Sequence, residues 1–347
     1  MLEIDGSIGE GGGQVLRTAL SVSCVLRKPV RIRNIRAGRG QPGLRPQHLA
    51  VCNMLAKLCG AKMEGAAIGS SEVVFEPGEM MGGRHEFDIG TAGSCTLFLQ
   101  AALPVLLCSG EKCSLLVKGG THVRGAPTFE YFSEVFLPAA RRFGVNAEAK
   151  MLRAGFYPKG GGEVLLEAAP SSLSGAAFSA EPGNKASYRI ISFGIPQHVA
   201  EREEKTLREK LAGFEISGEA IDAPASCAGN AITVWKGAIG ASSLGERRKK
   251  AEDVAAEACD LFLKECGTGD RKAEAGLHNS ECGTGTLAAY VDSRLADQLL
   301  IYAALARGES RYRTPEMTGH LKTNAKVLCS MTGRNIILGS DGSVGVI

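Results

Sequence analysis

The sequence predicts an α+β protein built from three repeated units, with a further module inserted before the last unit. The segment LRTAL ending at Leu20 recurs as LQAAL ending at Leu103 and as IYAAL ending at Leu305. Leu20 and Leu103 are 83 residues apart, and Gly60 of KLCGA and Gly144 of RRFGV are 84 residues apart. Two landmarks with one period indicate duplicated units. The third copy follows the second by 202 residues, which predicts an insertion.

The elements of the first unit follow from turn signals and hydrophobic periodicity. A Gly-rich turn is expected to precede an apolar helix, and residues 30–35 are rich in β-branched side chains and predict a strand. A second turn leads to an amphipathic helix that begins near Pro46 and stops at Gly60, because glycine favours the left-handed conformation that ends many helices. A strand pair is expected to follow.

The third unit repeats this order near the end of the chain. Residues 311–314 take the place of the strand, and residues 322–331 take the place of the second helix, with Gly333 as its stop. Residues 336–347 contain Asp-Gly between two β-rich runs, which predicts a final hairpin.

The excess residues lie between Pro170 and about Gly276, and their pattern predicts a small α/β module. It begins after the run SSLSGAAFSAEPGN, whose composition is typical of a linker. Strands are expected over 188–193 and 231–235, and helices over 199–213 and 246–265. The charge runs EREEK (201–205) and ERRKK (246–250) are interpreted as solvated helix faces, since no aromatic side chains alternate with them.

Composition limits the class of protein. The 347 residues are 22% charged and 44% hydrophobic, as in a globular protein, and a net charge of +3 allows an anionic substrate without indicating non-specific binding to long duplexes. The sequence predicts neither an export signal nor a membrane span. A cytoplasmic location is therefore expected. The eleven cysteines are odd in number and never spaced as Cys-x-x-Cys, which favours reduced thiols over disulfides or a zinc site.

Two glycine-containing turns are candidates for phosphate binding. The turn GEGGGQ at 9–14 lets a backbone approach a ligand, although tight packing explains such a turn equally well. The pattern GxxxxGK[ST] is absent, and GxGxxG fails because Gln14 stands where its last glycine would be. The second turn, RAGRGQPGLRPQH at 36–48, presents guanidinium groups that suit phosphate, with surface ion pairs as the alternative; Arg17 would join them if the turns converge.

His320 is the candidate nucleophile among six histidines. It lies in TGHLKTN (318–324), in the second turn of the third unit, where the first unit has its arginine turn. A neutral imidazole at a helix start, near groups that bind phosphate, is able to attack phosphorus. Position alone does not separate this role from a structural histidine. No Gly-x-Ser-x-Gly elbow offers a serine nucleophile instead.

Several segments resemble the RNA 3′-terminal phosphate cyclase family over nearly the full length. In chain order they are DGSIGEGGGQVLR (5–17), IRAGRGQPGL (35–44), GSCTLFLQ (93–100), GFYPKGGG (155–162), HVAERE (198–203) and LADQL (295–299). The resemblance implies an α+β fold of three two-helix, four-strand units, similar to the C-terminal domain of translation initiation factor three and related to the enolpyruvyl transferases. It also implies a small α/β insert. On this basis residues 1–182 and 277–347 form a catalytic domain of repeats at about 1–83, 84–170 and 277–347, and residues 183–276 form the insert.

The resemblance implies an ATP-dependent ligase that turns an RNA 3′-phosphate end into a 2′,3′-cyclic phosphate. His320 would take AMP from ATP, releasing pyrophosphate, and AMP would pass to the RNA 3′-phosphate before the 2′-OH attacks and AMP leaves. A Mg²⁺ or Mn²⁺ ion would neutralise the triphosphate. RNA 3′-phosphate ends and ATP are therefore the expected partners, no membrane is involved, and a homo-oligomer is compatible with the sequence.

The resemblance also assigns roles to single residues. The nucleotide would contact Gln100, Pro127 and the run Arg294, Leu295, Ala296, Asp297 and Gln298. Phosphates would contact Arg17, Arg36, Arg39 and Gln47, and Glu10 would act on the metal or triphosphate side. Arg294 departs from the family pattern, which often has Tyr or His there; its planar guanidinium could still stack on a base opposite Pro127.

Two other functions compete with this one. A non-catalytic relative that serves ribosomal RNA processing would have lost the nucleophile, whereas this chain retains His320, Glu10 and the arginine turn. An enolpyruvyl-type transferase would need a phosphoenolpyruvate pocket and no covalent nucleotide. The motifs favour the cyclase.

Overall fold

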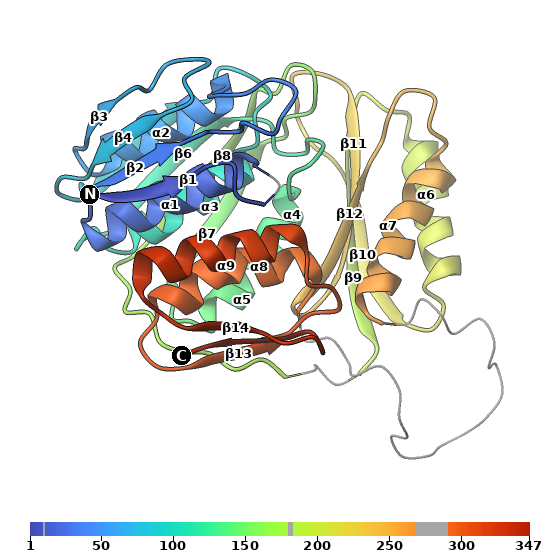
Figure 1. The fold of residues 1–347 in the computed structure, drawn as a ribbon. Helices are drawn as coiled ribbons and strands as arrows, with labels where there is room; N and C mark the ends of the chain where they lie inside the picture. The colour runs from blue at the N-terminus through green and yellow to red at the C-terminus, as the bar shows by residue number, and fades with distance from the viewer. Residues whose placement is uncertain (10, 180–182, 268–290) are drawn as a thin grey trace.

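The computed structural model describes residues 1–9, 11–179, 183–267 and 291–347. These residues form four small sheets and the helices that pack between and beside them (Figure 1). Three sheets surround a group of central helices, and the fourth belongs to the insert at one side of the molecule (Figure 1). The expected boundary at 276/277 lies outside the described residues.

The first two sheets have the same strand order, β1-β2-β4-β3 and β5-β6-β8-β7. In each sheet the first pair of strands is parallel and the other pairs are antiparallel. The strands of the first are β1(Leu2–Asp5), β2(Val30–Arg33), β3(Lys62–Glu64) and β4(Val73–Glu76). Those of the second are β5(Gly83–Asp88), β6(Cys113–Gly119), β7(Ala147–Arg153) and β8(Gly162–Ala168).

The helices of this half are α1(Gly13–Leu26), α2(Pro46–Leu58), α3(Cys95–Leu106) and an interrupted helix made of α4(Phe129–Tyr131), the π-helical turn η1(Phe132–Phe136) and α5(Leu137–Arg141). The expected helix start at Pro46 is confirmed, and Gly60 has the left-handed φ of 57° that turns the chain after α2. β2 is shorter than the strand predicted over 30–35. It ends at Arg33 because Asn34 and Arg36 both adopt positive φ, which a strand does not allow.

The last part of the chain contains α8(Ser293–Leu305), α9(Gly319–Thr332) and a sheet of β13(Ser310–Arg313), β14(Ile336–Leu338) and β15(Ser343–Val346) in the order β13-β15-β14. The hairpin predicted over 336–347 is confirmed, and Gly333 caps α9 at φ 73°. α9 begins three residues earlier than predicted, because the Thr318 side chain accepts from the Leu321 N–H and caps the first turn.

This third sheet has three strands in the described part of the chain, not the four expected, and the run predicted as a linker lies along its edge. Ser174 forms a parallel bridge with Arg307, which precedes β13, and Ala177 forms one with Arg311 of β13. The Gly175 N–H donates to the Arg307 carbonyl at 2.7 Å. A Cβ on Gly175 would lie 2.0 Å from the Glu309 carbonyl oxygen, so a small residue is required there.

The insert contains a sheet of order β10-β9-β11-β12 covered by two helices (Figure 1). Its elements are β9(Lys185–Phe193), α6(Gln197–Lys210), β10(Glu215–Asp222), β11(Gly229–Lys236), β12(Ile239–Leu244) and α7(Ala251–Glu265). Buried side chains between residues 186 and 262 form a hydrophobic cluster of their own. The helix predicted from residue 246 begins only at Ala251, so the run ERRKK lies mainly in a loop, where Arg248 has φ 72°.

Burial of apolar faces holds the central helices together. α1 packs on α2, α3 and α9, and α9 packs on α8, within one large hydrophobic cluster. None of the described helices is long and apolar enough to cross a membrane.

Candidate active site

A cavity of about 420 Å³ opens where the N-terminal halves of α1, α3, α8 and α9 meet. Volumes of this order suit a small-molecule ligand. Seven residues predicted from the sequence line it: Arg17, Gln100, Pro127, Arg294, Asp297, Gln298 and His320. The fold therefore brings together residues from positions 17 to 320 of the chain.

His320 is the second residue of α9 and is exposed toward this cavity. Its Nδ1 lies 2.7 Å from Oε1 of Gln14 on α1. An amide oxygen only accepts, so Nδ1 donates in this contact, and in the neutral form of the ring Nε2 would carry the lone pair. The contact leaves the ring in the tautomer that a nucleophile needs.

Asp297 fixes the orientation of the Gln14 amide. The Gln14 Nε2 donates to both carboxylate oxygens of Asp297, at 2.5 Å each, so the amide oxygen must face His320. Burial raises the pKa of Asp297 to about 6, against the opposing influence of His320, Asn324, Gln14 and Arg17. The result is a chain of hydrogen bonds from a carboxylate through an amide to an imidazole.

Gln14 is a site residue that the sequence did not assign. In the sequence it stands out only as the position where the GxGxxG pattern fails. The available signal was its place at the start of α1, directly after the Gly-rich turn and three residues before Arg17. Its partners are 283 and 306 residues away, which no local pattern reveals.

The Gly-rich turn itself is required by packing. A Cβ on Gly9 would lie 1.9 Å from Oγ1 of Thr323 on α9, and one on Gly13 would lie 2.4 Å from Nε2 of His48. Small residues at these positions allow α1 to approach both α9 and α2.

The opposite part of the cavity carries the remaining predicted nucleotide residues. The Gln100 Nε2 donates to Gln298 Oε1 at 2.7 Å, which links α3 to α8, and the side chain of Arg294 is exposed at the start of α8. Leu295 and Ala296 do not line the cavity with their side chains. Both are fully buried in the hydrophobic core.

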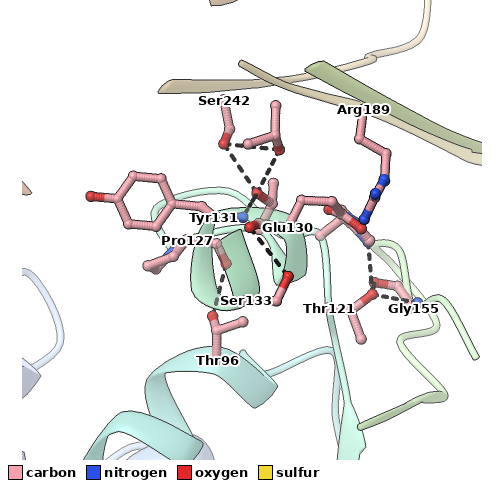
Figure 2. Close-up of polar contacts among 12 residues, drawn as sticks. Thr96, Thr121, Pro127, Glu130, Tyr131, Ser133, Gly155, Arg189 and Ser242 are labelled. Atoms are coloured by element: carbon pink, nitrogen blue, oxygen red, sulfur yellow. Dashed lines mark hydrogen bonds and ion pairs between the residues drawn. The ribbon is translucent and has the colours of Figure 1, made fainter. Parts of the chain in front are cut away.

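The loop of Pro127 and Thr128 is held by hydroxyl groups on two sides, and Figure 2 shows Thr96 on one side and Ser242 on the other. Thr96 of α3 donates to the Pro127 carbonyl at 2.8 Å. The neighbouring Thr128 hydroxyl lies 2.8 Å from Thr233 and 3.0 Å from Ser242, on strands β11 and β12 of the insert. These groups are buried or half-buried, so they fix the loop that brings Pro127 to the cavity.

The arginine turn converges with Arg17, as its sequence suggested. Burial lowers the pKa of Arg36, and the nearby charges of Arg39 and Arg45 lower it further. Burial also lowers the pKa of Arg17 to about 10, although Asp297 opposes this shift. Several cations held close together make a site for an anion, because a bound anion relieves their repulsion.

His48 keeps this cluster free of an additional charge. It is buried at the start of α2, where its Nδ1 accepts from the Arg45 N–H at 3.2 Å. Burial, followed by the charges of Arg17, Arg36 and Arg45, lowers the pKa of His48 to about 4. The imidazole is therefore neutral near pH 7.

The remaining predicted residues lie outside the small cavity. Arg36 and Gln47 line a larger adjoining cavity, and Arg39 is exposed near Gly12. Glu10, the predicted metal-side acid, lies outside the described residues. No group of three or more His, Cys, Asp or Glu side chains suited to hold a metal occurs among the residues the structure describes.

Comparison with known proteins gives matches over nearly the whole length of this chain. The family model described as RNA 3′-terminal phosphate cyclase matches residues 8–338. A protein of that name from Archaeoglobus fulgidus is 41% identical over 340 residues, which cover 96% of each chain. Proteins of the same name from Methanosarcina mazei and Nitrosospira multiformis are 37% and 38% identical, over 93% and 94% of this chain and 93% and 90% of theirs.

Among solved structures, an enolpyruvyl transferase, NikO from Streptomyces tendae, is similar over 60% of this chain and 37% of that one. The sequence identity is 14% and the TM-score is 0.28. A likeness this weak has no bearing on the fold or the site.

Proposed function

Because the chain belongs to the RNA 3′-terminal phosphate cyclase family, we propose that it uses ATP to convert an RNA 3′-phosphate end into a 2′,3′-cyclic phosphate. The observation that carries this proposal is the contact of His320 Nδ1 with Gln14, which leaves Nε2 as the nucleophilic nitrogen in a cavity of nucleotide size. The names of the relatives supply the reaction class, and the geometry supplies the roles below.

In the first step His320 Nε2 attacks the α-phosphorus of ATP. The Nε2–P bond forms, the bond to the bridging oxygen breaks, and pyrophosphate leaves with its electron pair. The imidazole becomes cationic because Nδ1 keeps its proton. The Gln14 oxygen, 2.7 Å away, stabilises that charge, so the contact strengthens as the bond forms.

In the second step an oxygen of the RNA 3′-phosphate attacks the phosphorus of AMP, and His320 leaves as neutral imidazole. The 2′-OH then attacks the 3′-phosphorus, its proton is released to solvent, and AMP departs. The covalent nucleotide divides one difficult displacement into easier ones, since AMP is a good leaving group where oxide is a poor one.

The cavity residues then take the following roles. Pro127 and Arg294 would lie on the two faces of the adenine, with Gln100 and Gln298 beside it, and Arg17 would bind the phosphates. Arg36, Arg39 and Gln47 would bind the RNA phosphate. Among the described residues the nucleotide cavity offers one carboxylate, Asp297, and Gln14 already occupies it, so a Mg²⁺ or Mn²⁺ ion would be held mainly by the triphosphate and water. Glu10 is the expected protein ligand, and the ion would neutralise phosphate charge.

Labelling with α-³²P ATP tests the covalent step. The protein is incubated with labelled ATP and Mg²⁺ or Mn²⁺ and denatured, and we expect an acid-labile, base-stable adduct. His320→Ala should abolish the label. His198→Ala is the matched control, because His198 is exposed on α6 in the insert. Absence of label on the wild-type protein with either metal would refute the histidine mechanism and favour a non-catalytic role in ribosomal RNA processing.

A further inference from the structure

A second cavity, of about 1280 Å³, adjoins the candidate active site. The two share Arg17, Leu97, Gly125 and Ala126 in their linings, so Arg17 stands at the junction. The larger cavity lies between the main body and the insert. Its walls come from the arginine turn, the loops around residues 91–94, 122–126 and 156–158, and the insert loops at 228–230 and 244–247.

The charge of this cavity is strongly positive. Five arginines line it: Arg17, Arg36, Arg45, Arg124 and Arg247. Glu246 is the only carboxylate among its described lining residues, and it pairs with Arg124 at 2.9 Å, where 86% of the Arg124 side chain is exposed. A groove with this excess of guanidinium groups suits a polyanion with regularly spaced phosphates.

Tyr157 supplies an exposed aromatic ring at the edge of the same cavity. It is 77% exposed, more than any other large hydrophobic side chain of the described residues. The adjacent Phe156 is buried and stacks on His122 with ring centroids 5.2 Å apart. The Gly160 N–H donates to the Phe156 carbonyl at 2.7 Å, closing a turn that directs Tyr157 outward.

The loop that carries Tyr157 is fixed on both sides. The N–H groups of Thr121 and His122 donate to the Gly155 carbonyl at 2.8 and 3.1 Å (Figure 2 shows Thr121 beside Gly155). On the insert side, the Ala154 N–H donates to the Pro224 carbonyl at 2.9 Å. An exposed ring on a fixed loop makes a stacking surface that costs little entropy to use. The segment 155–162 was recognised in the sequence but had no role in the proposed reaction.

The insert supplies the opposite wall through the loop after β12. The Gly245 N–H donates to the Asn230 carbonyl at 2.9 Å, and the Lys249 N–H donates to the Glu246 carbonyl at 3.0 Å. These bonds hold Arg247, which is exposed, against the cavity. Arg247 belongs to the run ERRKK (246–250), which the sequence pattern predicted to be a solvated helix face.

We infer that the larger cavity binds the single-stranded nucleotides that precede the RNA 3′-end, with a base stacked on Tyr157 and backbone phosphates on Arg124 and Arg247. This inference rests on the proposed function, since it takes the RNA end to lie at Arg17. Aromatic stacking beside a positively charged groove is how proteins bind single strands with little sequence preference. The insert thus forms one side of the RNA channel.

Binding of a 3′-phosphorylated, fluorescein-labelled ten-nucleotide RNA, measured by anisotropy without ATP, tests this inference. Tyr157→Ala should raise Kd about tenfold, within the range for the loss of one base–aromatic stack, and Tyr157→Phe should restore binding. Arg247→Ala should weaken binding and lower the slope of log Kd against log salt by about 0.7, the value for one phosphate contact on a single strand.

Arg311→Ala is the matched control, because Arg311 is an exposed arginine on β13 that pairs with Glu309. It should change neither Kd nor slope. Wild-type Kd and salt slope in both Tyr157→Ala and Arg247→Ala would overturn the inference, as would equal weakening by Arg311→Ala. Labelling of wild-type protein by α-³²P ATP separates the two proposals. Label with unchanged RNA binding in the variants refutes the RNA channel alone, whereas absence of label with weakened RNA binding refutes the cyclase mechanism alone.

Discussion

Replacement of Gln14 by alanine tests the hydrogen-bond chain from Asp297 to His320. The substitution removes the acceptor 2.7 Å from His320 Nδ1 and the donor 2.5 Å from the Asp297 carboxylate. His320 stays in place on α9, capped by Thr318. In the proposed mechanism, the imidazole then loses the group that selects its tautomer and stabilises its charge in the transition state.

The magnitude follows from the charge on the imidazole. A hydrogen bond to a charged group contributes about 1.5–3 kcal/mol, more than one between neutral groups. In the proposed step the ring is neutral before attack and cationic after it, so most of this difference would appear in the barrier. The rate of adenylylation should therefore fall about 10- to 150-fold. ATP binding should change less, because Pro127, Gln100 and Gln298, the residues proposed to contact the nucleotide, remain.

Single-turnover labelling with α-³²P ATP at saturating ATP measures this rate. Gln197→Ala provides a matched control, since Gln197 is an exposed glutamine at the start of α6, far along the chain from the site. Thermal unfolding of both variants checks that the fold is retained. A Gln14→Ala protein that is folded and adenylylated at the wild-type rate would refute the argument that Gln14 orients His320.

Three further predictions concern the loop, the fold and the metal. Thr96→Val removes the hydroxyl that donates to the Pro127 carbonyl. In a steady-state assay KM for ATP should therefore rise about fivefold, equivalent to about 1 kcal/mol. An unchanged KM would show that this hydrogen bond does not contribute to nucleotide binding. Burial raises the pKa of Asp292 from 3.8 to about 7, so its contribution to the free energy of unfolding is complete below pH 3.8 and is lost as the pH rises to about 7. In urea titrations the wild-type protein should lose stability relative to Asp292→Asn over that pH interval. If the free energies of unfolding of the two proteins changed in parallel with pH, the raised pKa of Asp292 would be contradicted. Chelation of divalent ions should abolish labelling by α-³²P ATP, with recovery on adding Mg²⁺ or Mn²⁺; full labelling under chelation would exclude the expected metal.

The sequence predicted best those elements whose boundaries depend on local chemistry. The start of α2 at Pro46 and the turns at Gly60 and Gly333 follow from conformations that these residues favour by themselves. The final hairpin follows from Asp-Gly between β-rich runs in the same way.

The errors occur where tertiary contacts decide the conformation. Residues 174–178 have the composition of a linker, but hydrogen bonds to residues 307–311 hold them along the third sheet. The run ERRKK has helical composition, yet the bond of the preceding Gly245 N–H to the Asn230 carbonyl and the bond of the Lys249 N–H to the Glu246 carbonyl keep it a loop at the cavity. In both cases the partner lies elsewhere in the chain, so composition misleads.

The candidate site divides in the same way. His320, Asp297, Gln100, Arg17, Arg36 and Arg294 were assigned from motifs, and they lie around two adjoining cavities. Gln14 was missed because its role depends on two partners in the last unit. Leu295 and Ala296 belong to the same motif as Asp297, but on a helix their side chains face the core.

The amide between Asp297 and His320 gives the site a property that a direct carboxylate contact would not. The protein also contains the direct arrangement, since Glu130 Oε2 lies 2.6 Å from His122 Nε2 in a buried pair. A carboxylate beside an imidazole favours the protonated ring, and an imidazolium has no lone pair with which to attack phosphorus. Gln14 offers His320 an acceptor without a net charge, while Asp297 prevents the amide from turning over. In the proposed mechanism, Asp297 thus selects the tautomer of His320 through the Gln14 amide.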